Sequence, residues 1–124
     1  MSPTRATLRD TLLREMTVKR DAARGYVLGV HGEALAAAHA AFVAAGSYGH
    51  GPAWVALAEY LLSTNPTITG VTFDDEGDAF LAYAEKEAAL QELRTRQIDT
   101  ISDDRALREA IAAARAGGFG HGDL

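Results

Sequence analysis

The sequence predicts an α+β fold in which two β-hairpins form one four-stranded antiparallel sheet packed by about five helices. Two observations predict it. Short runs rich in β-branched and aromatic residues occur in two pairs, and turn-forming residues separate the members of each pair. Two segments with apolar residues at helical spacing follow each pair. The order is therefore one helix and then two strand–strand–helix–helix units, and helices on one face of the sheet would bury every apolar stripe.

The first half of the chain supplies one hairpin and the helices on either side of it. Its predicted elements are a helix over residues 4–14 (within an N-terminal segment 1–14), strands over 15–21 and 26–30, and a helix over 33–45. Leu8 and Leu12 share one face of the first helix. In the second helix, Leu35, Phe42 and Val43 are expected to form the buried stripe.

The second half repeats this arrangement. Its predicted elements are a helix over 52–64, strands over 68–74 and 79–84, a helix over 86–97, a helix that opens at Ser102, and a flexible glycine-rich tail over 117–124. Trp54 and the leucines that follow it at helical spacing indicate a helix packed firmly on the core. Ser102 is the predicted N-cap of the last helix, because Asp103 and Asp104 would then lie favourably in its first turn.

Length and composition indicate a single folded domain spanning residues 1–124. The chain is 48% hydrophobic and 23% charged, and it contains no cysteine, which excludes disulfides and thiolate zinc sites. Neither an apolar run long enough to span a membrane nor a secretory signal is present, so we expect a cytoplasmic protein without a membrane partner. A net charge of −5 without a basic stripe argues against a nucleic-acid partner and favours a basic protein partner.

Carboxylates crowd the turn of the second predicted hairpin. An acidic tip on a rigid hairpin is a suitable surface for a basic protein. The alternative is an ordinary solvated turn, since Asp and Gly are favoured in turns for backbone reasons alone. We assign partner binding to the carboxylates of the tip and two that follow it, namely Asp74, Asp75, Glu76, Asp78, Glu85 and Glu87.

The four histidines offer little catalytic or metal chemistry. His31 and Glu33 have the spacing of the zinc deaminases, but those enzymes also need two cysteines. His39 is expected at a buried or rim position of its helix. His50 and His121 each lie between two glycines, and two histidines without a carboxylate make a poor metal site. We therefore expect no metal, no cofactor and no catalytic residue, and predict that the chain is not an enzyme.

Two stretches of the chain carry a family resemblance. They are Gly49-His50-Gly51-Pro52-Ala53-Trp54 and Phe73-Asp74-Asp75-Glu76-Gly77-Asp78-Ala79-Phe80-Leu81-Ala82-Tyr83. In their order and separation they resemble the Gly-Asn-Gly-Tyr-x-Trp and Phe-Asp-x-Glu-Ala-Gly-x-Phe-x-Ala-Tyr stretches of the immunity protein 51 family, and the resemblance runs over about residues 26–114. The chain departs from the pattern at His50, at Pro52 and at residues 77–78, which are loop positions.

The resemblance implies a protein that binds and neutralises a cognate bacterial toxin, with no catalytic residues to carry over. Trp54, Phe73, Phe80 and Tyr83 in these stretches are expected to pack in the core and the hairpin. Two alternatives stay open: a general interaction or regulatory module of the same fold, and a histidine-based metal-binding protein. Monomer and homodimer are both compatible with the sequence.

Overall fold

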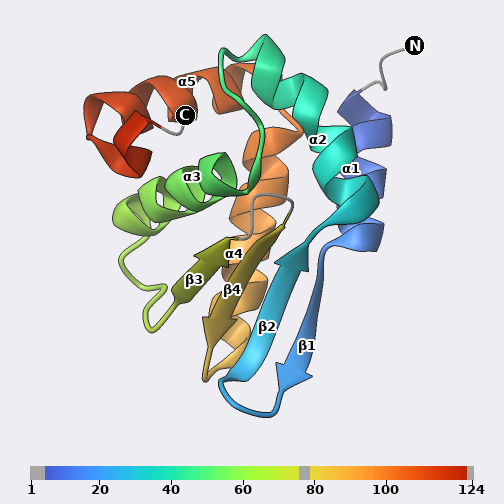
Figure 1. Cartoon of the computed structure of the whole chain (residues 1–124), viewed down its shortest axis with the longest axis vertical. Helices are drawn as coiled ribbons and strands as arrows, with labels where there is room; N and C mark the ends of the chain where they lie inside the picture. The colour runs from blue at the N-terminus through green and yellow to red at the C-terminus, as the bar shows by residue number, and fades with distance from the viewer. Residues whose placement is uncertain (1–4, 76–78, 123–124) are drawn as a thin grey trace.

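The computed structural model describes residues 5–75 and 79–122, and it confirms the predicted α+β class (Figure 1). The elements are α1 (Arg5–Glu15), β1 (Thr17–Asp21), β2 (Gly25–Val30), α2 (Gly32–Ala44), α3 (Gly51–Thr64), β3 (Thr72–Asp75), β4 (Phe80–Ala84), α4 (Glu87–Ile101), α5 (Asp104–Ala116) and the 3₁₀-helix η1 (Phe119–Gly122). In these ranges, no helix has the length and apolar character needed to cross a membrane.

The sheet has the strand order β1-β2-β4-β3, and all neighbouring strands are antiparallel. The two hairpins therefore join through their second strands, where Leu28 lies opposite Ala82 and Val30 lies opposite Phe80. Successive side chains of a strand point to opposite faces. These four side chains lie on the same face, and all are buried. This inner face is the one that the helices cover.

The core lies between the inner face of the sheet and the helices α3, α4 and α5. Figure 1 shows α4 passing behind the sheet, with α3 beside it. Trp54 of α3 lies at the junction: its ring centroid is 5.5 Å from that of Phe42 and 6.0 Å from that of Phe80. The apolar stripe predicted for the last helix is confirmed, because Leu107, Ala110, Ile111 and Ala114 are all buried.

The predicted stripe of α2 is wrong in part. Phe42 is buried as expected, but Val43 is 52% exposed and Leu35 is only half-buried. The residues that accompany Phe42 in the core are the alanines of the helix, Ala34, Ala38 and Ala41. Helix α2 packs against α1, and small side chains allow two helix backbones to approach closely, so its alanine face points inward.

The boundary between α4 and α5 also differs from the prediction. Helix α4 continues to Ile101, and Ser102 is its C-cap, with its hydroxyl donating a hydrogen bond to the carbonyl oxygen of Ile98. Asp103 is the N-cap of α5 instead, because its carboxylate accepts a hydrogen bond of 3.1 Å from the Ala106 N–H. Both residue types are good N-cap residues. Because α4 extends to Ile101, Ser102 ends α4 and Asp103 becomes the N-cap of α5.

Two further segments differ from the expected pattern. Strand β3 begins only at Thr72, since the chain before it forms a turn in which Gly70 has a φ of 74°. Within the predicted tail, η1 lies against α3, and the Phe119 ring meets Tyr60 edge to face at 6.1 Å. The flexibility of residues 117–124 stays a prediction.

Candidate protein-binding site

The face of the sheet opposite the core carries an apolar centre with a polar margin. Alternation along β2 and β4 places Val27, Leu81 and Tyr83 on this face, and all three are half-buried. Lys19, Thr72 and Asp74 lie on the flanking strands and are exposed. We call these six residues the outer face; Figure 1 views the sheet from this side. An apolar centre inside a polar rim is the usual anatomy of a protein interface.

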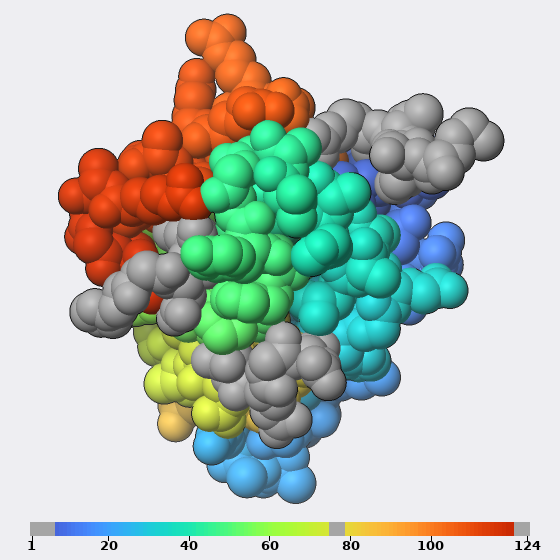
Figure 2. Space-filling view, turned by 45° about the horizontal axis from the view of Figure 1, so that its top comes forward, coloured from blue at the N-terminus to red at the C-terminus, as the bar shows by residue number. Residues whose placement is uncertain are grey.

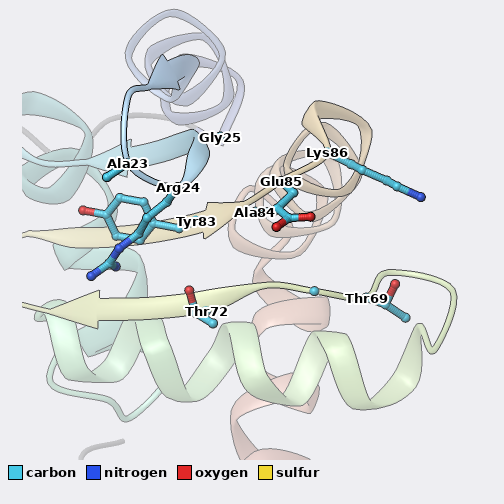
Figure 3. Close-up of a pocket in the computed structure, with 10 residues that line it drawn as sticks. Ala23, Arg24, Gly25, Thr69, Thr72, Tyr83, Ala84, Glu85 and Lys86 are labelled. Atoms are coloured by element: carbon cyan, nitrogen blue, oxygen red, sulfur yellow. The ribbon is translucent and has the colours of Figure 1, made fainter.

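A cleft opens at one end of the outer face, next to the β1–β2 turn (Figure 3). Its volume is about 750 Å³, and we call it the end cleft. It exists because β3 stops pairing with β4 at Thr72, opposite Tyr83, while β2 still pairs with Ala84. The residues that line it come from three segments, namely Ala23, Arg24 and Gly25, then Thr69, Gly70 and Thr72, then Tyr83, Ala84, Glu85 and Lys86.

The β1–β2 turn positions Arg24 over the outer face. The Asp21 carboxylate accepts hydrogen bonds from the backbone N–H groups of Ala23 and Arg24, at 3.2 Å and 2.8 Å, and so fixes the turn. Gly25 follows with a φ of 93°, and a Cβ there would lie 2.8 Å from the carbonyl oxygen of Ala84. Only glycine therefore fits where the turn crosses the end of β4.

Arg24 links the turn to both strands of the second hairpin. Its guanidinium carbon lies 4.2 Å from the centroid of the Tyr83 ring, a cation–π contact, and its Nη1 donates a hydrogen bond of 3.1 Å to Asp74 Oδ2. Of the aromatic residues expected to pack in the core and the hairpin, Tyr83 therefore lies on the outer face of the hairpin, beneath Arg24. The alternation of Phe80, Ala82 and Ala84 with Leu81 and Tyr83 is the sequence signal that indicates this orientation.

The predicted acidic residues do not form one cluster. Asp74 lies on the outer face and is paired with Arg24. Glu85 and Glu87 follow β4 at its far end, with the whole strand between them and the hairpin turn. The side chain of Asp75 and the residues Glu76 and Asp78 lie outside the described part of the chain.

Glu85 and Glu87 are the carboxylates without a partner at the cleft end of the sheet. Both are exposed, and within residues 5–75 and 79–122 neither forms an ion pair. Glu85 lines the end cleft, whereas Glu87 lies outside it in the first turn of α4. The two differ in position but carry the same charge, so they form a matched pair for substitution.

Arg14 has a raised pKa, and it lies away from this surface. A hydrogen bond from Arg14 to Glu15 raises the pKa of the guanidinium above its usual value, and the nearby Glu33 of α2 adds to the effect. Both ion pairs of Arg14 are solvent-exposed. The pair with Glu33 connects α1 to α2, the pair with Glu15 lies within α1, and neither has a part in the candidate site.

In the part of the chain that the structure describes, no histidine belongs to a cluster of possible metal ligands. His31 and His39 are exposed, and the described residues contain no group of three or more His, Cys, Asp or Glu that could hold an ion. The side chain of His121 lies outside the described part. His50 has a structural role that sequence analysis missed: it is the N-cap of α3, where its Nδ1 accepts a hydrogen bond of 3.3 Å from the Ala53 N–H. The related family stretch has asparagine at this position, which is itself a preferred N-cap residue.

Replacing His50 with alanine is expected to lower the free energy of unfolding by about 0.5–1 kcal/mol, because an orphan N–H of the central helix loses its acceptor. His50→Asn should recover the loss, and His39→Ala at an exposed position should change little. Urea unfolding followed by circular dichroism measures all three. Equal midpoints for His50→Ala and the wild type would refute the capping role.

A second group of exposed apolar residues lies on another face. Figure 2 shows α2 in teal and the connection to α3 in green at the middle of that face. Val43 is 52% exposed on α2, and Tyr48 is 61% exposed on the connection, where it stacks with His50 at 5.6 Å. Isolated apolar residues at the surface are normal. The outer face and the end cleft are therefore the stronger candidate.

Comparison with known proteins indicates the family of this chain. A family model described as Immunity protein 51 matches residues 16–116, a range that holds the whole sheet and the helices α2 to α5. Searches of the curated proteins and of the solved structures gave no significant match.

Proposed function

Because the chain belongs to the immunity protein 51 family, we propose that it binds a cognate bacterial toxin and neutralises it through a protein–protein interface. The family match over residues 16–116 is the observation that carries this proposal. The role is binding rather than catalysis: the protein covers a functional surface of the toxin or holds the toxin in an inactive state. The cytoplasm, where an incoming toxin acts, is the proposed location.

We propose that the toxin docks on the outer face and the end cleft. Tyrosine and arginine are the residue types that most often dominate binding energy in interfaces, and Tyr83 and Arg24 lie together here, already held in place. Glu85 and Glu87 supply negative charge at the edge of this surface. Asp75, Glu76 and Asp78 are proposed as a second acidic contact beyond its other end. A toxin with a basic surface fits both.

Removing the Tyr83 side chain tests where the toxin binds. We expect Tyr83→Ala to weaken binding by at least about tenfold, because the apolar centre of the interface and the support of Arg24 are both lost. Tyr48→Ala removes an even more exposed tyrosine from another face and should leave the affinity unchanged. The measurement is the affinity of the purified chain for the products of the genes adjacent to its own, with rescue of growth in cells that express a product that is toxic.

The outcomes separate two questions. Tight binding of the wild type with growth rescue supports the immunity function, and a selective loss in Tyr83→Ala supports the proposed surface. Equal effects of the two tyrosine substitutions on the affinity would indicate that the toxin binds at another surface. Failure of the wild type to bind or to protect would contradict the immunity function and leave a general interaction module as the interpretation.

A further inference from the structure

We infer that the end cleft receives a basic side chain, lysine or arginine, from the partner protein and that Glu85 is its counter-charge. The inference deepens the proposed function, and it rests on that function only for the origin of the side chain. The preference of the cleft for a cation is a property of this chain alone.

The shape of the cleft follows from the way the second hairpin ends. Pairing between β3 and β4 stops at Thr72 and Tyr83, and Gly70 turns the chain away from β4 with a φ of 74°. Ala84 remains paired with Tyr26 of β2, but no residue of β3 pairs with it on the other side. A volume of about 750 Å³ at this fork accommodates a long side chain.

Two charged side chains that line the cleft, those of Glu85 and Lys86, form no ion pair with any described residue. Arg24 is satisfied by Asp74 at 3.1 Å and by the Tyr83 ring at 4.2 Å. In Figure 3 the Lys86 side chain extends away from the other labelled residues. Glu85 lines the cleft and forms no ion pair with any described residue. A carboxylate in such a setting attracts a cationic guest, and the net charge of −5 acts in the same direction.

The other residues that line the cleft can contact the rest of a bound lysine or arginine side chain. The hydroxyl groups of Thr69 and Thr72 come from the opposite wall, and hydroxyl oxygens accept hydrogen bonds from ammonium and guanidinium groups. Ala23 and the Tyr83 ring also line the cleft and offer apolar contact to the aliphatic stem of lysine or arginine.

An anion is the alternative ligand for the end cleft. Lys86 lines the cleft as Glu85 does, and α4 begins at Glu87, so the positive end of the helix dipole is close. Glu85 and Glu87 oppose this effect. The two guests therefore have to be compared directly on the same protein.

The experiment titrates the isotope-labelled full chain with N-acetyl-arginine methylamide and follows the backbone amide signals by NMR. The citrulline analogue has the same shape without the charge, and inorganic phosphate is the anionic probe. We expect saturable shifts with the arginine probe at the amides of Gly25, Gly70 and Glu85, and no such response to citrulline or phosphate. Glu85→Gln should weaken arginine binding by at least about threefold, whereas Glu87→Gln, which removes the same charge outside the cleft, should not.

Three results would overturn the inference: arginine shifts that avoid the cleft, equal binding by citrulline or phosphate, or equal affinities of Glu85→Gln and the wild type. None of these depends on the toxin. If the arginine probe binds as expected and the neighbouring toxin does not, the proposed function fails and the cation site remains. If the toxin binds but the probe does not, the immunity function stands without this site.

Discussion

Trp54→Ala is expected to lower the free energy of unfolding by about 3–5 kcal/mol and to leave much of the protein unfolded at 37 °C. Trp54 has no exposed surface, and its ring contacts Phe42 of α2 and Phe80 of β4. Truncation would leave a cavity where a helix pair meets the sheet. Domains of this size have a total stability of about 5–15 kcal/mol, so this loss is a large share of it.

Circular dichroism in urea is the appropriate measurement, because Trp54 is the only tryptophan and its fluorescence disappears with it. Trp54→Phe is the matched control. The indole N–H makes no hydrogen bond to any described residue, so the substitution by phenylalanine removes volume but breaks no such bond. We therefore expect it to lower the free energy of unfolding by less than about 1.5 kcal/mol. A loss below about 1 kcal/mol for Trp54→Ala would show that this junction is not central to the core.

Gln97→Met is expected to raise the stability by about 1–3 kcal/mol and the melting temperature by several degrees. Gln97 has no exposed surface on α4, and neither its amide nitrogen nor its amide oxygen bonds to a described residue. Burying a polar group without a hydrogen-bond partner lowers the stability by about the same amount. Methionine has nearly the same length and flexibility, so it replaces the amide without a change of shape.

Gln91→Met is the control for Gln97→Met, since it makes the same substitution at an exposed position of the same helix. It should alter the melting temperature by no more than a degree or two. A lower melting temperature for Gln97→Met would contradict the prediction, and it would indicate that the amide stabilises the native core.

The sequence alone predicts the hairpins, their antiparallel pairing and most helix boundaries. These features depend on interactions over a few residues. The Asn65-Pro66 pair ends α3, and the spacing of Leu107 and Ile111 marks the inward side of α5. The same local signals also carry the family resemblance, which the match over residues 16–116 confirms.

Local sequence patterns do not predict the structure where two local arrangements are equally favourable. On α2, both the alanine face and the face with Val43 are apolar, and packing against the rest of the core selects the alanines. At the start of α5, Ser102 and Asp103 both cap well, and the length of α4 selects Asp103. In each case the deciding interaction comes from an element that the local pattern does not contain.

The candidate site depends most on the tertiary structure. The sequence identifies Glu85 as a candidate, but it groups that residue with an acidic turn at the other end of β4. Only the fold brings the β1–β2 turn against the second hairpin, so that Arg24 covers Tyr83 and pairs with Asp74, a residue fifty positions away. The end cleft arises in the same way, from the point where β3 leaves β4 while β2 remains. Periodicity shows which side of a strand a residue occupies, whereas the pairing of distant strands decides what lies beside it.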